Sequence, residues 1–190
     1  MNFSRLKDSI SFTLRFFSKP RFTGSILPSS RFLGRAMVRA ANLSRDKIAV
    51  ELGPGTGPIT RQILASGFPP ENLYCVEFDK KMCEILKREF PSIRVINAGA
   101  ENLSRLMEGE KRPVCAILSS LPLLSLPKDI VQKILGESES VLERGGRFAQ
   151  FTYNLKRDPK CVGFSNMSHL CAEKVYLNLP HARVDSFEKI

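Results

Sequence analysis

The fold is decided by the stretch Glu51-Leu52-Gly53-Pro54-Gly55-Thr56-Gly57 of this 190-residue chain. A short apolar run over residues 48–52 precedes it and predicts a buried strand, and a helical pattern over residues 59–65 follows it. Glycines allow the backbone to turn sharply and a ligand to approach it closely. The dinucleotide fingerprint G-x-G-x-x-G would need glycine where this chain has Pro58. The turn therefore favours a nucleoside without a pyrophosphate.

A carboxylate follows this turn at the spacing expected for a ribose-binding residue. The next apolar run, residues 73–78, predicts a second strand that contains Glu77, 20 residues after Gly57. A carboxylate at a strand end can accept two hydrogen bonds from ribose hydroxyls. Phe78, the next residue, can lie against the face of an adenine ring.

Strands and helices alternate along the rest of the chain. Such alternation predicts an α/β fold built from parallel βαβ units with right-handed crossovers. Further strands are expected over residues 94–98, 114–119, 146–153, 174–179 and 183–188, and further helices over residues 30–42, 80–90 and 127–142. Pro180-His181-Ala182 separates the last two strands at a hairpin spacing.

The glycine-rich turn and the segment Val76-Glu77-Phe78-Asp79 resemble the first two motifs of class I S-adenosylmethionine-dependent methyltransferases. The resemblance implies a Rossmann-like fold with a mostly parallel seven-stranded sheet and a C-terminal antiparallel hairpin, preceded here by N-terminal helices. It also implies S-adenosylmethionine as the cofactor, with Glu51 holding its methionine moiety and Glu77 its ribose. The remaining cofactor-binding residues implied by these motifs are Gly53, Pro54, Gly55, Thr56, Gly57 and Phe78.

One position departs from the pattern of this family. An aspartate that binds the adenine amine often follows the third strand, and the aligned position here is Gly99. We therefore expect the backbone around Ala100, or the side chain of Glu101, to bind the adenine.

The segment Ser119-Ser120-Leu121-Pro122-Leu123-Leu124-Ser125-Leu126-Pro127 follows the fourth predicted strand, where class I methyltransferases hold the methyl acceptor. Related enzymes that methylate a base amine carry an aromatic residue at the position of Leu123, and this residue stacks on the flipped base. Leucines favour an aliphatic neighbour, although they can also simply cover the edge of the sheet. We expect Ser119, Ser120 and Tyr153 at strand ends near the acceptor amine, with Ser119 also beside the cofactor.

Four segments together resemble the bacterial phospholipid N-methyltransferase family, which converts phosphatidylethanolamine stepwise toward phosphatidylcholine. They are SILPSSRFLGRAM (25–37), SSLPLLSLP (119–127), GGRFAQFTY (145–153) and YLNLPHARV (176–184). The resemblance implies a phospholipid amine as the substrate. The related ribosomal RNA adenine dimethyltransferases share the first motif and usually add a small C-terminal helical domain, before which this chain ends.

Positive charge is concentrated at the N-terminus of the chain. Residues 1–45 contain nine Lys and Arg residues against one Asp, whereas the whole chain has a net charge of +10. Apolar residues over 3–17 recur on one helical face, and Arg31, Arg35 and Arg39 recur every four residues. We interpret residues 1–45 as a basic helical segment that docks on an anionic membrane and covers the active site of a methyltransferase domain over 46–190.

These features predict a cytoplasmic protein at the periphery of the inner membrane, with a phospholipid substrate and without a nucleic-acid partner. The basic N-terminus also has the composition of a mitochondrial transit peptide. The longest uncharged stretch near the middle, residues 114–127, is too short to span a bilayer. Five cysteines without a CxxC pair predict reduced thiols and no metal site. No protein partner follows from the sequence.

Two other functions remain open at this point. The shared first motif and the basic charge are also compatible with an adenine N6-methyltransferase that acts on RNA. The glycine at position 99 is compatible with a membrane-binding protein that keeps the methyltransferase fold without turnover.

Overall fold

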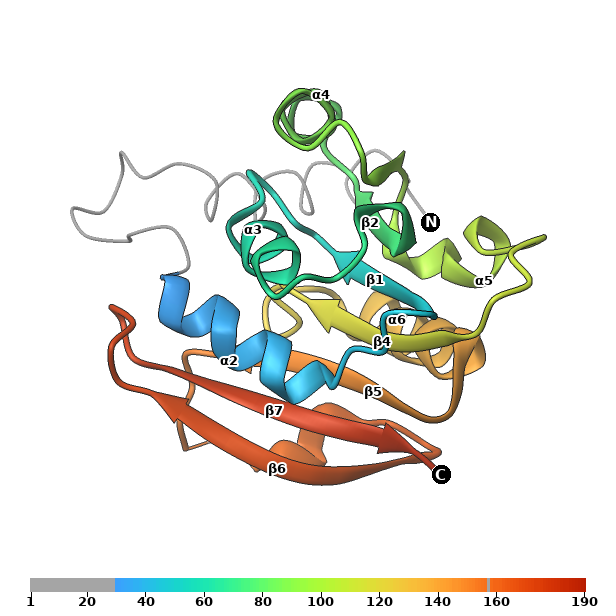
Figure 1. Cartoon of the computed structure of the whole chain (residues 1–190). Coiled ribbons are helices and arrows are strands. Elements are labelled where there is room, and N and C mark those ends of the chain that lie inside the picture. Colours follow the sequence, from blue (N-terminus) through green and yellow to red (C-terminus); the bar gives the residue numbers. More distant parts are fainter. Residues whose placement is uncertain (1–29, 157) are drawn as a thin grey trace.

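One sheet of seven strands forms the centre of the molecule (Figure 1). The computed structural model describes residues 30–156 and 158–190. The strands are β1 (Ile48–Leu52), β2 (Leu73–Glu77), β3 (Arg94–Asn97), β4 (Val114–Ser119), β5 (Leu142–Thr152), β6 (Met167–Val175) and β7 (Ala182–Lys189). Their order is β3-β2-β1-β4-β5-β7-β6; the first five pair in parallel, and β7 runs antiparallel to both β5 and β6. The predicted Rossmann-like methyltransferase fold is confirmed.

Helices cover both faces of this sheet. One face carries α2 (Arg31–Ala41), α3 (Pro58–Ala65) and α4 (Lys80–Glu89), and the other carries α5 (Leu103–Leu106) and α6 (Lys128–Val141). Each face has its own apolar cluster because the parallel strands are buried on both sides. No helix in the described part of the chain is long and apolar enough to cross a membrane.

The helix α2 joins the core of the domain. It begins after Ser30, whose hydroxyl accepts a hydrogen bond from the backbone N–H of Leu33 at 3.3 Å, as expected for an N-cap. Leu33 and Met37 are fully buried in the same cluster as β1. The hydroxyl of Ser186 in β7 donates to the carbonyl of Ala40 at 2.9 Å. The predicted helix over residues 3–17 and the rest of residues 1–29 lie outside the described residues.

The strand order places a crevice beside β1. From β1 the chain moves outward through β2 to β3, and then returns to β4 on the other side of β1. The loops that follow β1 and β4 therefore leave the sheet in opposite directions, and ligands of open α/β sheets bind between such loops at the carboxyl ends of the strands. The topology thus brings together the glycine-rich turn and the segment over residues 119–127.

The C-terminal hairpin differs from the prediction. A strand was expected over residues 174–179, but β6 spans Met167–Val175, and the connection to β7 consists of residues 176–181. β6 lies at the edge of the sheet, where a strand of mostly polar residues can be stable. It is held by the backbone hydrogen bonds to β7 and by one half-buried face. The prediction was wrong because the apolar residues that follow β6 suggested a strand. Strand β5 also begins at Leu142, four residues earlier than predicted.

We expect Leu33→Ala to lower the free energy of unfolding by about 3 kcal/mol, because it leaves a cavity under α2. Urea unfolding followed by circular dichroism measures this change. Arg35→Ala on the exposed face of the same helix is the control and should stay within about 0.5 kcal/mol of the wild type. Equal effects of the two substitutions would contradict the packing of α2 described above.

Candidate cofactor and acceptor site

The turn over residues 53–57 connects β1 to α3, and its glycines meet different surroundings. Gly53 and Gly55 both have positive φ angles, 66° and 59°, which favour glycine. A side chain at Gly53 would collide with Leu121 in the loop after β4. Apart from Gly55 itself and its two neighbours in the chain, no described residue lies within 4 Å of the place where a Cβ of Gly55 would stand. The backbone at Gly55 is therefore open to a ligand, whereas Gly53 permits close packing. Gly57, by contrast, faces Phe90, the residue that follows α4.

Glu51 provides a buried carboxylate beneath this turn. One oxygen, Oε2, accepts hydrogen bonds from the hydroxyl of Thr60 at 2.6 Å and from the thiol of Cys75 at 3.6 Å. The other oxygen, Oε1, has no partner among the described residues. Burial raises the pKa of Glu51 from 4.5 to about 7. A buried carboxylate oxygen without a partner fits the ammonium group of a methionine moiety, which would supply both a charge and a donor.

Glu77 at the end of β2 is also buried, and burial raises its pKa. Its carboxylate accepts backbone N–H groups from Gly55 at 3.0 Å and from Asp79 at 2.9 Å. Each oxygen keeps a second lone pair, so the carboxylate can still accept hydrogen bonds from two ribose hydroxyls. The side-chain amide of Asn97 donates to the carbonyls of Glu77 and Phe78, each at 2.9 Å. Asn97 therefore fixes the end of β2, a role that the sequence analysis missed.

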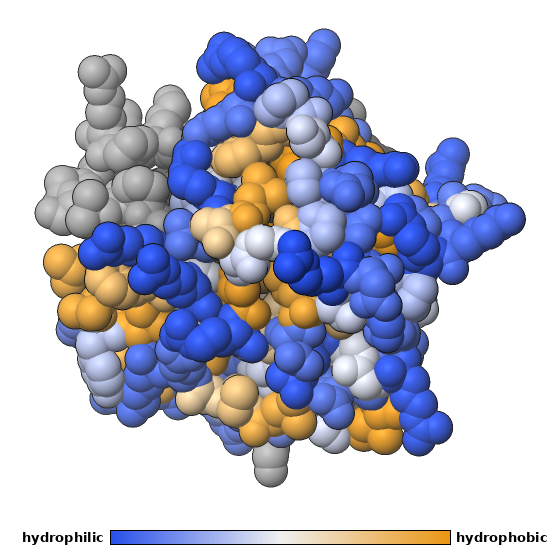
Figure 2. All heavy atoms as spheres, in the orientation of Figure 1, coloured by the Kyte–Doolittle hydropathy of each residue, from blue (hydrophilic) through white to orange (hydrophobic). Residues whose placement is uncertain are grey.

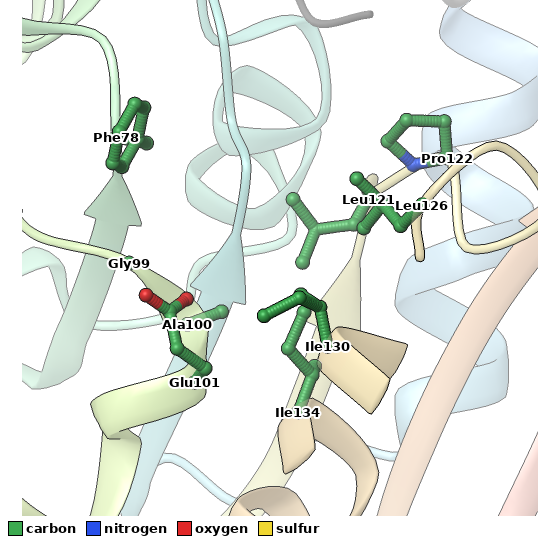
Figure 3. Close-up of a pocket in the computed structure, with 9 residues that line it drawn as sticks. All are labelled: Phe78, Gly99, Ala100, Glu101, Leu121, Pro122, Leu126, Ile130 and Ile134. Atoms are coloured by element: carbon green, nitrogen blue, oxygen red, sulfur yellow. The ribbon is translucent and has the colours of Figure 1, made fainter. Parts of the chain in front are cut away.

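A shallow pocket, open to solvent, begins at Phe78, the residue that follows Glu77 (Figure 3). Residues from the end of β2 and from the segment after β3 line one side, and residues from the loop after β4 and from α6 line the other. They are Phe78, Gly99, Ala100 and Glu101 on the first side and Leu121, Pro122, Leu126, Ile130 and Ile134 on the second. The largely apolar lining suits a flat, weakly polar ring such as adenine.

The carboxylate of Glu101 lies against Gly99, the position at which the family often has an aspartate. A Cβ added to Gly99 would collide with the carboxylate of Glu101, so this carboxylate already occupies the space where a side chain at 99 would begin. The amide of Asn102 donates to Glu101 Oε1 at 3.3 Å. The absence of a side chain at Gly99 thus makes room for a carboxylate that comes from two residues further along the chain.

The loop after β4 is held against the end of β1. The backbone N–H of Ser120 donates to the carbonyl of Leu52 at 2.9 Å, and the buried hydroxyl of Ser119 accepts from the N–H of Leu121 at 3.4 Å. From β5, the side-chain amide of Gln150 donates to the carbonyl of Leu121 at 3.1 Å. Ser119 and Ser120 therefore lie at the carboxyl end of β4 beside the end of β1, and their place near an acceptor amine stays a prediction. Gln150 was not recognised from the sequence, because it reaches this loop only through the pairing of β4 with β5.

Tyr153 lies elsewhere. Its ring packs edge to face on Phe151 at 5.5 Å between centroids, within the apolar cluster under α2. Burial raises the pKa of its phenol, which an interaction with Asn178 partly offsets. Leu121 and Ile130 of the pocket belong to the cluster on the other face of the sheet. The structure thus does not bring Tyr153 to the lining of the pocket, and its catalytic role stays a prediction.

The fold and the paired carboxylates at the ends of β1 and β2 define a Rossmann-like, nucleoside-binding enzyme domain. Residues 49–146 match the model of the methyltransferase domain family, and the chain belongs to this family. The predicted cofactor, S-adenosylmethionine, is confirmed by this membership together with structural neighbours that contain it or its product. The protein is therefore an S-adenosylmethionine-dependent methyltransferase.

Two curated relatives differ in the substrates that their names give. The ornithine lipid N-methyltransferase of Singulisphaera acidiphila is 28% identical over 151 residues, which cover 77% of this chain and 79% of the relative. The ribosomal RNA small subunit methyltransferase A of Malacoplasma penetrans is 31% identical over 137 residues. That alignment covers 68% of this chain but only 48% of the relative, so the chain spans about half of the RNA enzyme.

Solved structures share the fold at low sequence identity. The N-methyltransferase NodS from Bradyrhizobium japonicum, solved with S-adenosyl-l-homocysteine, aligns with a TM-score of 0.67 at 10% identity and covers 97% of this chain and 98% of its own. The magnesium protoporphyrin IX methyltransferase from Synechocystis, solved with S-adenosylmethionine, aligns with a TM-score of 0.65 at 9% identity, covering 96% and 98%.

Glu51 should make the cofactor-free protein less stable as the pH rises. Its pKa is 4.5 in the unfolded chain and about 7 in the folded protein. Between these values the folded protein holds a proton that the unfolded chain has released, so stability falls by about 3 kcal/mol from pH 5 to pH 8. We expect Glu51→Gln to remove this decrease and also to abolish cofactor binding. Urea unfolding at several pH values measures the first effect, and calorimetry with S-adenosylhomocysteine measures the second. Parallel pH profiles of variant and wild type would contradict the assignment.

We expect Glu101→Ala to weaken S-adenosylhomocysteine binding about tenfold, because it removes a charged acceptor for the adenine amine. The double variant Gly99→Asp/Glu101→Ala restores a carboxylate beside the same pocket and should regain most of the affinity. Isothermal titration calorimetry measures both constants. An unchanged affinity of Glu101→Ala would mean that the adenine is bound by backbone groups near Ala100 instead.

Proposed function

We propose that this methyltransferase acts on the headgroup amine of a phospholipid and converts phosphatidylethanolamine stepwise toward phosphatidylcholine. The observation that carries the proposal is the leucine-rich loop after β4. Leu126 lines the pocket and Leu124 is 54% exposed beside it, while Leu123 stands where base-methylating relatives have an aromatic residue. A loop of this kind offers an aliphatic surface to a substrate with acyl chains.

The relationship to an ornithine lipid N-methyltransferase supports a lipid amine as the acceptor. Ornithine lipid and phosphatidylethanolamine share a primary amine on a membrane-bound headgroup, so both are substrates to test. We favour phosphatidylethanolamine because four segments of the chain resemble the phospholipid N-methyltransferase family.

The protein has two chemical tasks: it must align the acceptor amine with the methyl group and remove water from around that amine. S-adenosylmethionine supplies a methyl group that is already activated on a sulfonium sulfur. The acceptor amine must be neutral to attack it, and burial next to the leucines lowers the pKa of that amine. Gln150 and the backbone N–H of Leu123 both donate to the carbonyl of Leu121, at 3.1 Å and 2.9 Å, and so fix the loop after β4. The hydroxyl of Ser120, half-buried at the crevice, can accept an N–H of the amine. This contact would direct the nitrogen lone pair at the methyl carbon.

We place the reaction at an anionic membrane on the cytoplasmic side. Arg31, Arg35 and Arg39 are exposed on α2, and Arg39 pairs with Glu173 of β6. Cationic residues near an anionic surface contribute about 1 kcal/mol each to binding. The helix expected over residues 3–17 would add an apolar face.

An adenine N6-methyltransferase that acts on RNA is the second candidate. The 31% identity to a ribosomal RNA methyltransferase favours it. Without an aromatic residue at position 123, however, the loop after β4 offers no ring to stack on a flipped base. A non-catalytic role is the third candidate, and the carboxylate of Glu101 near Gly99 weakens the argument for it.

We expect label in the lipid fraction when the protein is incubated with methyl-labelled S-adenosylmethionine and vesicles of phosphatidylethanolamine and phosphatidylglycerol. Parallel tubes contain ornithine lipid or ribosomal RNA. The Glu77→Ala variant should lose the label because it lacks the ribose-binding carboxylate, whereas Arg144→Ala, an exposed change in the β5 segment, should keep it.

Thin-layer chromatography of the lipid product then gives the headgroup and the number of methyl groups. Label in the RNA alone would replace the proposal by the RNA candidate. Binding of S-adenosylmethionine without label in any tube would favour the non-catalytic role.

A further inference from the structure

The connection between β6 and β7 forms an exposed apolar tip, which we define as residues 176–181. Tyr176 is 60% exposed, Leu177 is 69% exposed and Leu179 is 59% exposed. These are among the most exposed large apolar side chains of the described residues. Large apolar groups gathered at one protruding loop usually mark an interaction site.

The hairpin tip is held in this conformation by one buried amide. Asn178, only 2% exposed, accepts the backbone N–H of Ser30 at 3.0 Å through Oδ1 and donates to the carbonyl of Pro180 at 2.7 Å through Nδ2. Its own carbonyl lies 3.2 Å from Nδ1 of His181. Asn178 thus joins the hairpin tip to the start of α2 and turns inward, while its apolar neighbours point out. The exposure of the leucines is therefore a property of an anchored loop.

The two elements that adjoin the hairpin tip, α2 and the end of β6, carry exposed basic residues. Arg31 and Arg35 on α2 and Lys174 at the end of β6 are exposed. Neither α2 nor the segment over residues 174–184 contains an acidic residue. In Figure 2, an apolar cluster at the left edge, over the hairpin tip and the start of α2, is bordered by strongly hydrophilic residues. Exposed apolar side chains next to basic residues are complementary to an anionic bilayer, because the apolar groups can enter the acyl region while the cations contact the phosphates.

The hairpin tip lies on the functional side of the molecule. Figure 1 shows it on the same side as the carboxyl ends of β1 and β4, where the turn after β1 and the loop after β4 form the crevice. A membrane that contacts the hairpin tip would therefore also face the side on which a lipid amine has to enter.

We propose that the hairpin tip inserts Leu177 and Leu179 into the interfacial region of an anionic bilayer, while Arg31 and Arg35 contact lipid phosphates. The inference extends the proposed function, since it adds the hairpin tip, which lies outside the basic segment over residues 1–45, to the membrane contact already proposed for Arg31 and Arg35. It commits to lipid as the occupant because the apolar side chains and the cations occur together.

The absence of tryptophan from the chain provides a direct test. We expect the emission of the full-length Leu177→Trp variant to shift to shorter wavelength on addition of vesicles of phosphatidylethanolamine and phosphatidylglycerol, and to be quenched by lipids with brominated acyl chains. Ile190→Trp is the matched control: Ile190 is 70% exposed and follows β7 at the opposite end of the hairpin. Its emission should not change. Leu177→Ser/Leu179→Ser should reduce vesicle binding in co-sedimentation by about tenfold or more.

Vesicle binding without a shift in Leu177→Trp would overturn the inference. Short-wavelength emission of this variant before any lipid is added would also overturn it, since the hairpin tip would then be covered by another part of the chain or by a second molecule. Methyl transfer is measured separately. Insertion without lipid methylation would refute the proposed function and leave the inference supported, whereas lipid methylation without insertion would refute the inference alone.

Discussion

The carboxylate of Glu51, buried at the end of the central strand, is the constraint around which the site is built. The strand β1 is covered on both faces, so this side chain cannot reach water, and the side-chain donors to it among the described residues are the hydroxyl of Thr60 and the thiol of Cys75. Keeping a carboxylate there is unfavourable unless it is protonated or paired with a cation. The unpartnered oxygen therefore makes the folded protein complementary to a bound ammonium group, at the expense of the stability of the cofactor-free state.

The other contacts of the site extend outward from this strand end. Glu77 links the glycine-rich turn to the start of α4, and Asn97 fixes the strand end that presents Phe78. On the opposite side, Gln150 holds the loop that follows β4. Apart from the local bond between Glu77 and Asp79, these contacts join the ends of neighbouring parallel strands, so the geometry of the cofactor site depends on the sheet as a whole. Gly99 also shapes the site, because the absence of a side chain at this position leaves space for the carboxylate of Glu101.

The sequence was most informative at positions where the backbone geometry requires one particular residue type. Positive φ angles at Gly53 and Gly55 need glycine, and a strand before the turn with a helix after it specifies the Rossmann-like class. The roles of Asn97 and Gln150 were not predictable, since an amide in a strand acquires a specific partner only when its neighbouring strand is known. The edge strand β6 was missed for a related reason: its stability comes from the ladder to β7, which leaves no apolar pattern in its own residues.

The amino-acid sequence by itself determined the fold class, the cofactor and the positions of the two buried carboxylates, because these depend on local turn geometry and on the alternation of strands and helices. Only the tertiary structure decided which residues meet. It placed Tyr153 under α2 and away from the pocket, moved β6 earlier in the chain, and turned the apolar residues at 176–179 from an expected strand into an exposed loop. The physical reason is that hydrogen-bond pairing and burial between distant segments override the local preference of residues for a strand. An apolar run predicts a strand from the sequence whether it lies inside a sheet or in a loop that protrudes from it.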